Sequence, residues 1–532
     1  MMTELEFKSL QTQGFNRIPM VLEAFADLET PLSLYLKLAH TKSQGKHSFL
    51  LESVVGGERF GRYSFIGLPA RTVLRASGFG ADAKTEVHTD GALVETLPGN
   101  PLDSIAAFQS RFKVALRPGL PRFCGGLAGY FGYDTVRYIE KKLENTCPPD
   151  TLGCPDIMLL LCEELAVIDN LSGKLYLIVY ADPAQGEAYS QAKKRLRELK
   201  DQLRYSVTAP VVKPSQDYPV EREFSKADYL KAAERAKELI AGGDFMQVQV
   251  GQRLKKRYTE SPLSLYRALR SLNPSPYMYY YHMGDFHIVG ASPEILVRQE
   301  SVPPRSPAAQ AALPPEGALA ARAGPPPLGA KCETKITIRP LAGTRPRAAT
   351  PDADKLAETE LLADPKERAE HVMLIDLARN DIGRIAKIGT VKVTEAFAVE
   401  RYSHVMHIVS NVEGILSNGP GGQPLGSMDV LKATFPAGTL TGAPNVHAME
   451  IIDQLEPTKR GIYGGACGYL SFAGDMDVAI AIRTGIIKDG MLYVQAAAGI
   501  VADSVPELEW KETEAKARAL LRAAELVEEG LE

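Results

Sequence analysis

Short hydrophobic, β-rich runs separated by loops make up the first part of the chain, a pattern that predicts short β-strands. The runs 48–54 and 61–68 predict two neighbouring strands separated by the turn GGER. The stretch 165–181 predicts a hairpin, because two β-rich runs flank the residues NLSGK. A charged run with helical spacing then predicts a helix over 188–203, and the looser segment 208–222 predicts a linker.

The rest of the chain mixes helical and strand-like patterns. A helix is predicted between Ser225, a candidate N-cap, and the stop signal Gly242-Gly243. The other predicted elements are a strand over 246–254, a strand over 285–299 that breaks at Gly290 and Pro293, a hairpin over 477–501 and a helix over 512–531. We therefore expect two regions, one over 1–222 and one over 223–532.

The second region is interrupted by a segment of unusual composition, at about 301–334. Residues 301–330 contain eight prolines, nine alanines and no aromatic residue. Such a segment buries too little apolar surface to offset the entropy of ordering it. We expect a disordered or loosely held loop rather than an interdomain linker, because its flanks resemble two strands of one hairpin.

Composition and charge exclude several classes of protein. The chain has 532 residues, of which 45% are hydrophobic and 24% charged, and its net charge is −4. This balance gives no reason to expect nucleic acid or a membrane as partner, and no apolar run has the length of a membrane span. The six cysteines form no CxxC pair, and the first residues lack a secretory pattern. We expect reduced thiols and a cytoplasmic location.

Two pairs of glutamates repeat one spacing in distant parts of the chain. Glu367 and Glu370 lie in KERAEHVMLIDLARND, and Glu509 and Glu512 lie in LEWKETEAK. Residues three apart share one face of a helix. If the two helices meet, four carboxylates converge and form a site for a hard divalent cation such as Mg²⁺. The alternative is that both pairs lie on ordinary solvated helices.

Other segments carry groups that bind carboxylates. The sequence RPLAGTRPR places Gly343 and Thr344 between basic residues, where backbone and hydroxyl groups can contact an anion. Arg483, in AIRTG, lies on a predicted strand and offers a guanidinium for bidentate binding. The small residues of 496–501 let backbone N–H groups approach a ligand.

The sequence SHVMHIVSNVEG places two histidines, His404 and His407, on one predicted strand. At this spacing on a strand they face opposite sides, so at most one enters a given site. A strand histidine is more often a core residue than a catalyst. Together, the candidate acid, base, metal site and carboxylate clamp suggest an enzyme that acts on a small polyanionic acid.

Ten motifs then occur in a characteristic order: LLES, GRYSFIG, NPSPYMYY, GASPE, PLAGTRPR, AEHVMLIDLARNDIGR, FPAGTLTGAP, RGIYGG, IRTG and AGIVADS. By these motifs, over nearly the whole chain outside 301–334, the sequence resembles anthranilate synthase component I, a chorismate-utilising family. The resemblance implies an α+β chorismate-utilising fold with stacked, mostly antiparallel sheets flanked by helices. It also implies an active site in the second region and a regulatory pocket between the regions.

The function implied is a Mg²⁺-dependent lyase of tryptophan biosynthesis. Chorismate and ammonia would give anthranilate and pyruvate through aminodeoxyisochorismate, with feedback inhibition by tryptophan. Ammonia would come from a glutamine amidotransferase subunit, component II, in a heterotetramer, and free ammonia would also serve.

The resemblance also implies roles for particular residues. Glu370 and Glu512 resemble direct Mg²⁺ ligands, and Glu367 and Glu509 resemble supporting carboxylates. The residues that match substrate contacts are Gly343, Thr344, Tyr463, Arg483, Ala497, Ala498, Gly499 and Lys516. The residues that match catalytic positions are Glu294 as general acid, His407 at the pyruvate elimination, Thr441 and Gln247. The residues that match a tryptophan pocket are Glu52, Ser53, Pro276, Tyr277 and Met278.

Two positions distinguish related activities. Ala342 stands where aminodeoxychorismate synthases have a lysine that attacks the ring. Gln247 stands where isochorismate and salicylate synthases have a water-activating lysine, and a neutral amide cannot act as that base. Both favour anthranilate. The alternatives are an aminodeoxychorismate or aminodeoxyisochorismate synthase component and a non-catalytic tryptophan-binding homologue. Asn445 and His447 depart from the family's usual lysine and arginine, and AAAG replaces G-A-G.

Overall fold

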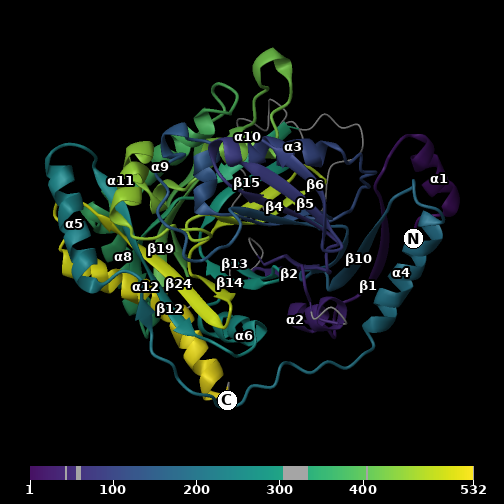
Figure 1. The fold of residues 1–532 in the computed structure, drawn as a ribbon, viewed down its shortest axis with the longest axis horizontal. Helices are drawn as coiled ribbons and strands as arrows, with labels where there is room; N and C mark the ends of the chain where they lie inside the picture. Colours follow the sequence, from purple (N-terminus) through teal and green to yellow (C-terminus); the bar gives the residue numbers. More distant parts are fainter. Residues whose placement is uncertain (42–44, 55–60, 303–332, 403–404, 531–532) are drawn as a thin grey trace.

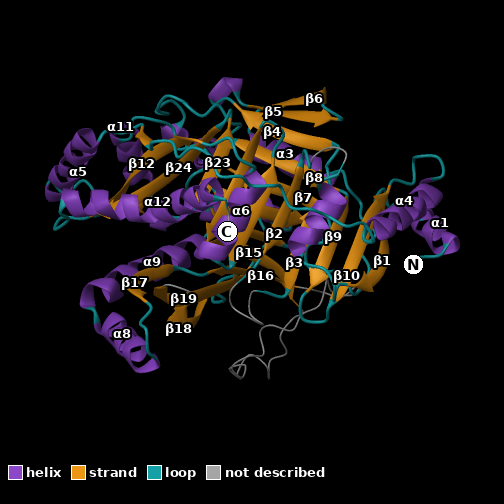
Figure 2. Cartoon of the chain, turned by 90° about the horizontal axis from the view of Figure 1, so that it is seen from below, coloured by secondary structure: helices purple, strands orange, loops and turns teal. Residues whose placement is uncertain are grey.

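The computed structural model describes residues 1–41, 45–54, 61–302, 333–402 and 405–530. It contains two large antiparallel sheets, which stack on each other and carry helices on their outer faces (Figures 1 and 2). The expected α+β architecture is therefore confirmed. The Pro/Ala-rich loop expected at 301–334 lies almost wholly outside the described residues.

Within the described residues, the first sheet has twelve strands. From edge to edge they are β1 (Ile18–Phe25), β10 (Lys174–Ala181), β9 (Glu164–Asp169), β3 (Tyr63–Gly67), β2 (Ser48–Glu52), β13 (Tyr277–His282), β14 (Phe286–Ser292), β23 (Thr484–Lys488), β24 (Met491–Ile500), β12 (Gln247–Arg257) and β11 (Glu221–Arg222), with β20 (Gly442–Ala443) also paired to β12.

The described part of the chain contributes twelve strands to the second sheet as well. In order they are β17 (Leu341–Pro346), β19 (Val405–Ile415), β16 (Glu333–Ile338), β15 (Ile295–Val302), β22 (Met476–Ile480), β21 (Ala466–Ser471), β7 (Gly126–Phe131), β8 (Ile157–Cys162), β4 (Thr72–Ser77), β5 (Lys84–Thr89) and β6 (Ala92–Pro98), with β18 (Lys392–Arg401) also paired to β19.

The α-helices lie around these sheets. They are α1 (Glu4–Thr12), α2 (Pro31–Leu34), α3 (Pro101–Ser110), α4 (Ala188–Gln202), α5 (Lys226–Ala241), α6 (Pro262–Leu272), α8 (Pro351–Ala363), α9 (Pro365–Gly383), α10 (Ser427–Thr434), α11 (Asn445–Leu455) and α12 (Pro506–Glu529). Helices α5, α11 and α12 gather at one end of the molecule, and α1 and α4 at the other (Figures 1 and 2). In the described part of the chain, no helix has the length and apolar character needed to span a membrane.

The main core fills the space between the sheets. It contains buried aromatic side chains from both, among them Phe49 and Tyr281 of the first sheet and Tyr130 and Tyr469 of the second. Further apolar layers pack helices onto the outer faces: α4, α6 and α12 cover the first sheet, and α3, α9 and α10 cover the second. Burial of apolar surface on both faces of each sheet is the main source of stability.

Local sequence signals explain several elements. The side chain of Ser225 accepts the N–H of Asp228 and so caps α5, as predicted. Asp364 caps α9 by accepting the N–H groups of Lys366 and Glu367. The predicted 477–501 hairpin turns at Asp489-Gly490, where both residues have positive φ, as a two-residue hairpin turn requires. The predicted hairpin over 165–181 is confirmed as β9 and β10.

Two predicted strands each divide between the sheets. Strand β14 continues through Gly290, so the break predicted there is wrong; the chain breaks only at Pro293, and β15 joins the second sheet. The predicted hairpin strand that contains Arg483 likewise splits into β22 in the second sheet and β23 in the first. An apolar run of this kind has no local feature that assigns its halves to different sheets.

Other predictions concern larger units. The flanks of the Pro/Ala-rich segment, β15 and β16, pair antiparallel from Arg298–Thr337 to Val302–Glu333, so their assignment to one hairpin is confirmed. Helix α12 begins at Pro506, before the predicted start at Glu512. Each sheet contains strands from both sides of residue 222. The division into regions 1–222 and 223–532 stays a prediction.

Candidate active site and a second pocket

Two of the candidate site residues lie where the chain passes from one sheet to the other. Glu294 follows β14, and Arg483 precedes β23, so each lies at a crossing. The crossings adjoin, because the Ala291 N–H donates to the Arg483 carbonyl at 3.1 Å and the Ile480 N–H to the Glu294 carbonyl at 3.0 Å. Arg483 adopts a left-handed backbone with φ of 51°, which is uncommon for a residue with a side chain.

Glu294 carries a buried carboxyl group, and the residue as a whole is only 6% exposed. Burial raises the pKa of Glu294 to about 8, although a hydrogen bond from the backbone of Leu341 partly opposes this. Since water no longer stabilises the carboxylate, Glu294 keeps its proton at neutral pH and is available as an acid.

His407, on β19, is oriented by a backbone carbonyl. Its Nδ1 lies 2.9 Å from the carbonyl oxygen of Gly343 and 3.1 Å from Oγ1 of Thr344. A carbonyl oxygen only accepts, so Nδ1 carries the proton and Nε2 of the neutral ring is a base. Burial lowers the pKa of His407 below its ordinary value of 6.5, which keeps the ring neutral.

Gly343 connects this histidine to the first glutamate of α9. It has a φ of +67°, and a side-chain carbon there would lie 3.1 Å from Oε2 of Glu367. Glycine thus allows the turn and leaves room for the carboxylate. The predicted ligand-binding residues Gly343 and Thr344, the catalytic candidate His407 and the metal candidate Glu367 are brought together.

The four predicted metal-binding glutamates lie as one pair on α9 and one pair on α12. The charge of one pair changes a pKa in the other. Burial raises the pKa of Glu370, and the charges of Glu367 and Glu512 raise it further. Burial also raises the pKa of Glu509, with a smaller contribution of the same sign from Glu512. The carboxylates of the two helices therefore repel one another.

Two internal cations partly balance that repulsion. Arg345 pairs with Glu367 at 3.2 Å, and Lys516 pairs with Glu512 at 2.7 Å. Within the described residues, no three His, Cys, Asp or Glu side chains are close enough together to bind a metal ion. The donor set of carboxylate oxygens nonetheless fits Mg²⁺, which prefers hard oxygen ligands.

Two cationic side chains lie near Glu512: Arg483, just before β23, and Lys516, on α12. Nη1 of Arg483 donates to the Lys516 carbonyl at 3.0 Å, and Nζ of Lys516 donates to the Ala497 carbonyl at 2.9 Å. Burial lowers the pKa of Arg483, and nearby Tyr463 and Glu512 partly counter this. Arg483 forms no ion pair with the part of the chain that the structure describes. It is therefore suited to bind an external carboxylate.

The remaining predicted residues line the adjoining edge of the first sheet. Ala498 and Gly499, on β24, face Val250 and Gln249 on β12. A side-chain carbon on Gly499 would lie 2.8 Å from Nε2 of Gln247 and 3.0 Å from Nε2 of Gln249, so glycine lets both amides approach the backbone.

Thr441 is buried in the segment beside this edge. Its hydroxyl donates to Oδ1 of Asn445 at 2.6 Å. His447, the second departure from the family pattern, instead pairs with Glu450 at 3.0 Å and is partly exposed. Asn445 thus orients Thr441, whereas His447 lies outside this contact.

Two residues of this site, Gln249 and Arg345, were not predicted from the sequence. Gln249 could have been found from strand periodicity, because residues two apart on a strand face the same side and Gln247 had been selected. Arg345 follows Thr344 directly in PLAGTRPR, but its pairing with Glu367 depends on the meeting of β17 and α9, which no local pattern indicates.

Comparison with known proteins identifies the family. The model of the chorismate binding enzyme family matches residues 64–302 and 328–522. The chain is 52% identical over 535 residues to "Anthranilate synthase component 1" of Neisseria meningitidis serogroup A, with all of both chains covered. The chain belongs to the anthranilate synthase component 1 family. It is therefore an enzyme of tryptophan biosynthesis, as the resemblance implied.

Other members of the anthranilate synthase component 1 family agree with this assignment. The relative from Pseudomonas aeruginosa is 49% identical over 538 residues, again with full coverage of both chains. The crystal structure of anthranilate synthase component I from Streptococcus pneumoniae TIGR4 has a TM-score of 0.71 and 33% identity, covering 94% of this chain and 99% of that one. A menaquinone-specific isochorismate synthase from Escherichia coli, with 19% identity and a TM-score of 0.65, shares the fold.

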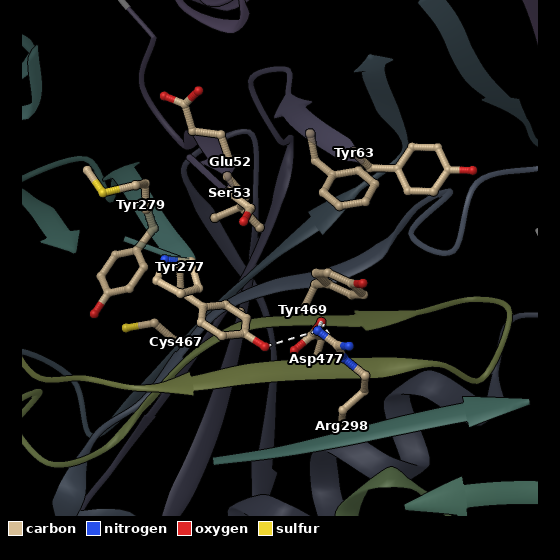
Figure 3. A pocket seen from close by; sticks show the side chains of 14 residues that line it. Glu52, Ser53, Tyr63, Tyr277, Tyr279, Arg298, Cys467, Tyr469 and Asp477 are labelled. Carbon is tan, nitrogen blue, oxygen red and sulfur yellow. Dashed lines mark hydrogen bonds and ion pairs between the residues drawn. The ribbon is translucent and has the colours of Figure 1, made fainter. Parts of the chain in front are cut away.

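In this member of the anthranilate synthase family, a second pocket lies between the sheets. Its empty space is about 540 Å³, part of it open to solvent. The five residues predicted to bind tryptophan all line it: Glu52, Ser53, Pro276, Tyr277 and Met278. Tyr63, Tyr279 and Tyr469 add aromatic walls (Figure 3).

Two of these five residues turn their side chains to the other face of the sheet. The carboxylate of Glu52 accepts hydrogen bonds from Tyr266 and from Arg270, at 2.5 and 2.7 Å. Met278 pairs with Glu52 in register and joins the apolar layer beneath α6. Both residues reach the pocket through their backbones. The Glu52 carboxylate therefore already has partners within the protein, on the face of the sheet away from the pocket.

Proposed function

We propose that this protein converts chorismate and ammonia into anthranilate and pyruvate through aminodeoxyisochorismate, the first committed step of tryptophan biosynthesis. The observation that carries the proposal is that a protonated acid and a neutral base each lie near one cation, which has no ion pair within the described residues. These are Glu294, His407 and Arg483. The function of the component 1 family supports it.

In the first step, Glu294 would act as the acid. Ammonia forms a bond to C2 of chorismate, the ring double bonds shift, and the C4–oxygen bond breaks. The departing hydroxyl takes the Glu294 proton and leaves as water. The raised pKa of Glu294 supports this role, because an ionised carboxylate has no proton to give.

In the second step, His407 would act as the base. Nε2 takes the ring proton, the ring becomes aromatic, and the bond between the ring and the enolpyruvyl oxygen breaks. The departing enolpyruvate then becomes pyruvate by taking up a proton at carbon. The hydrogen bond to Gly343 supports this role, since it orients the ring and leaves Nε2 unprotonated.

The chain also offers groups that would hold chorismate between these two. Arg483 and Tyr463 would bind the enolpyruvyl carboxylate. The backbone and hydroxyl of Gly343 and Thr344 would contact the ring substituents, and the residues Ala497, Ala498, Gly499 and Lys516 would complete the pocket. Gln247 and Thr441 would contact the incoming ammonia or the ring rather than transfer protons, because neither is a base at neutral pH.

We further propose Mg²⁺ as cofactor. Glu370 and Glu512 would be direct ligands and Glu367 and Glu509 supporting carboxylates. When bound, the ion would supply a Lewis acid and a template for the ring carboxylate of chorismate. The mutual repulsion of these glutamates supports the proposal, because a divalent cation would relieve it.

Ammonia would come from a glutamine amidotransferase subunit, component II, in a heterotetramer. Burial raises the pKa of the thiol at every described cysteine: Cys124, Cys147, Cys154, Cys162 and Cys467. Such thiols are poor nucleophiles for glutamine hydrolysis. The same five thiols form no disulfides, which supports action in the reducing cytoplasm.

Finally, we propose that the second pocket binds tryptophan as a feedback inhibitor. Its aromatic lining and its position between the sheets support this.

A fluorescence assay for anthranilate tests the main proposal. The reaction contains the purified protein, chorismate, Mg²⁺ and excess ammonium, without a partner subunit. We expect anthranilate to form, EDTA to abolish it and added Mg²⁺ to restore it. Unchanged chorismate in a folded, tryptophan-binding preparation would contradict the catalytic proposal and favour a non-catalytic homologue.

A further inference from the structure

A separate cavity lies beside Glu294, between α9 and the second sheet. It contains about 360 Å³ of empty space, part of it open to solvent, and we name it the α9 cavity. Most of its lining is apolar, from leucine and alanine side chains of α9 and from Ile338 on β16. Among the described residues that line it, only Glu294 and Asp381 are ionisable.

Asp381, near the end of α9, is a carboxylate that the proposed chemistry does not yet use. Within the described residues it accepts no hydrogen bond and forms no ion pair. Burial raises the pKa of Asp381 to about 6, and the charge of Arg384 partly opposes this. A carboxyl group that titrates near neutral pH both takes up and releases a proton under the conditions of the reaction.

The α9 cavity also contains an unused hydroxyl group. Oγ1 of Thr439 is buried and has no hydrogen-bond partner among the described residues, although the side chain lies close enough to Glu294 to favour its charged form. The other hydroxyl of the lining, on Thr434, donates to the Val430 carbonyl at 2.9 Å. Since a buried hydroxyl without a partner is costly, Thr439 is the group that would bind water.

The cavity is suited to ordered water. A buried water needs about two to four polar partners and roughly 30 Å³ of space. Glu294, Thr439 and Asp381 offer three partners, and the empty space is larger than one water requires. Hydrogen-bonded waters here would connect the buried acid Glu294 to Asp381, which is partly exposed to solvent.

Glu294 needs a source of protons in every turnover. In the proposed first step it gives its proton to the departing hydroxyl and remains as a buried carboxylate. The added nitrogen releases one proton in the same turnover, so the whole reaction neither consumes nor produces protons. Glu294 must therefore be reprotonated before it can act again.

We propose that Asp381 returns a proton to Glu294 through water and the Thr439 hydroxyl in the α9 cavity. This inference rests on the proposed acid role of Glu294. The Asp381 carboxyl gives its proton to the first water, each O–H group along the path passes one proton on, and the Glu294 carboxylate receives one. Asp381 then takes up a proton from solvent, which balances the proton that the added nitrogen released.

The order of the two acids supports this direction. The pKa of Asp381, about 6, lies below the pKa of Glu294, about 8, so transfer from Asp381 to Glu294 is favourable. Asp381 acts through Glu294 and does not touch chorismate. It is therefore a relay residue rather than a catalytic one.

Kinetics of Asp381→Asn test the relay, because Asn has nearly the same shape and cannot transfer the proton. With protein in excess over chorismate, each site acts once and begins with a protonated Glu294, so the rate should equal that of the unaltered protein. With chorismate in excess, kcat should fall roughly 10²-fold, the lower end for a positioned proton-transfer group. KM for chorismate should not change.

Rescue by imidazole is a readout that a merely structural role would not change. Asp381→Ala leaves room in the cavity for this small acid, which titrates near neutral pH like a histidine side chain. Added imidazole should restore kcat and should saturate. Triethanolamine at the same pH, which is too bulky for the position of the lost carboxylate, should not restore it.

Three further variants serve as matched controls. Thr439→Val removes the hydroxyl and should lower kcat, whereas Thr439→Ser keeps the hydroxyl and should keep kcat. Asp376→Asn alters an exposed carboxylate of α9 that pairs with Arg379 at 3.1 Å, and it should leave kcat unchanged.

The outcomes separate this inference from the proposal beneath it. If Asp381→Asn keeps kcat, or raises only KM for ammonium, the relay is wrong and the acid role of Glu294 stands. A single-turnover rate that falls as far as kcat, without rescue by imidazole, also contradicts the relay. Full activity of Glu294→Gln would mean that the acid role and the relay are both wrong. If Asp381→Asn does not fold, Thr439→Val and Thr439→Ser decide.

Discussion

At the scale of single residues, burial sets the protonation states on which the chemistry depends. Glu294 keeps a proton because its surroundings disfavour the charged form, and His407 remains neutral for the same reason. The two groups face the same site with opposite roles. This division between acid and base follows from their surroundings, since neither residue type has a fixed role by itself.

The pH profile tests the protonation of Glu294. The active form carries this proton and has a neutral His407, so kcat should be constant between the lowered pKa of His407 and about pH 8, and should fall as pH rises through the Glu294 pKa of about 8. Anthranilate formation is measured at a constant concentration of free ammonia, so that the titration of Glu294 is separated from the titration of ammonia. Glu294→Gln should lower kcat roughly 10²–10⁴-fold. A rate that keeps increasing above pH 9 under these conditions would contradict the assignment.

Arg483, the cation at the sheet crossing, should contribute mainly to the binding of chorismate. Arg483→Gln removes a charge-assisted contact worth about 1.5–3 kcal/mol, so KM for chorismate should rise roughly 10- to 100-fold. Arg522→Gln, on the exposed side of α12, is the control and should leave KM unchanged. Equal KM values for the two variants would exclude the proposed role of Arg483.

At the scale of elements, helices α9 and α12 bring two acidic pairs to one place. The sequence predicted both pairs, because their spacing repeats and helical geometry puts each on one face. It did not predict the Arg345–Glu367 pair, because that pair joins separate elements and has no local signal. The Lys516–Glu512 pair, in contrast, has the i,i+4 spacing of neighbours on one helix.

Ligand-induced stabilisation tests the metal site. Mg²⁺ with chorismate should raise the thermal unfolding midpoint, because a ligand that binds only the folded state stabilises it. Glu512→Gln should reduce that increase. Glu525→Gln, whose carboxylate pairs with Arg522 at the other end of α12, should keep it. The same stabilisation in both variants would mean that Glu512 is not a ligand.

A buried ion pair connects α12 to β12. Nζ of Lys256 lies 2.7 Å from the carboxylate of Glu528, and the two side chains are 2% and 4% exposed. Lys256→Met leaves Glu528 buried without its partner, so unfolding free energy should fall by about 3–5 kcal/mol. Lys231→Met removes an exposed pair with Asp228 and should cost less than ~1 kcal/mol. Urea titration of both variants compares them, and equal midpoints would contradict the account.

At the scale of the whole molecule, the two stacked sheets place the second pocket near the active site. The hairpins and most helices could be predicted, since their turns and caps are local. The sheet crossings at Pro293 and Arg483 could not, because the choice of sheet depends on partners far along the chain. Recognition of Glu52 as a ligand contact likewise missed that strand alternation turns its carboxylate toward Arg270.

The closeness of the two sites makes feedback testable. Tyr277 lines the second pocket and also a small cavity with Leu341 and Tyr402, whose ring lies 5.6 Å from that of His407. Tryptophan should therefore lower the rate of anthranilate formation. Ser53→Phe should fill the pocket and raise the inhibitory concentration more than about tenfold, an effect of ~1.4 kcal/mol or more. The rate of each protein with tryptophan is compared with its own rate without tryptophan. If Ser53→Phe is inhibited as strongly as the unaltered protein, tryptophan binds elsewhere.

The identity and ratio of the products test the central claim most directly. The protein is incubated with chorismate, Mg²⁺ and ¹⁵N-ammonium, and the mixture is followed by NMR and mass spectrometry. The account predicts ¹⁵N-anthranilate and pyruvate in equal amounts. A 4-amino product, or an amino intermediate that accumulates without pyruvate, would contradict the proposed reaction.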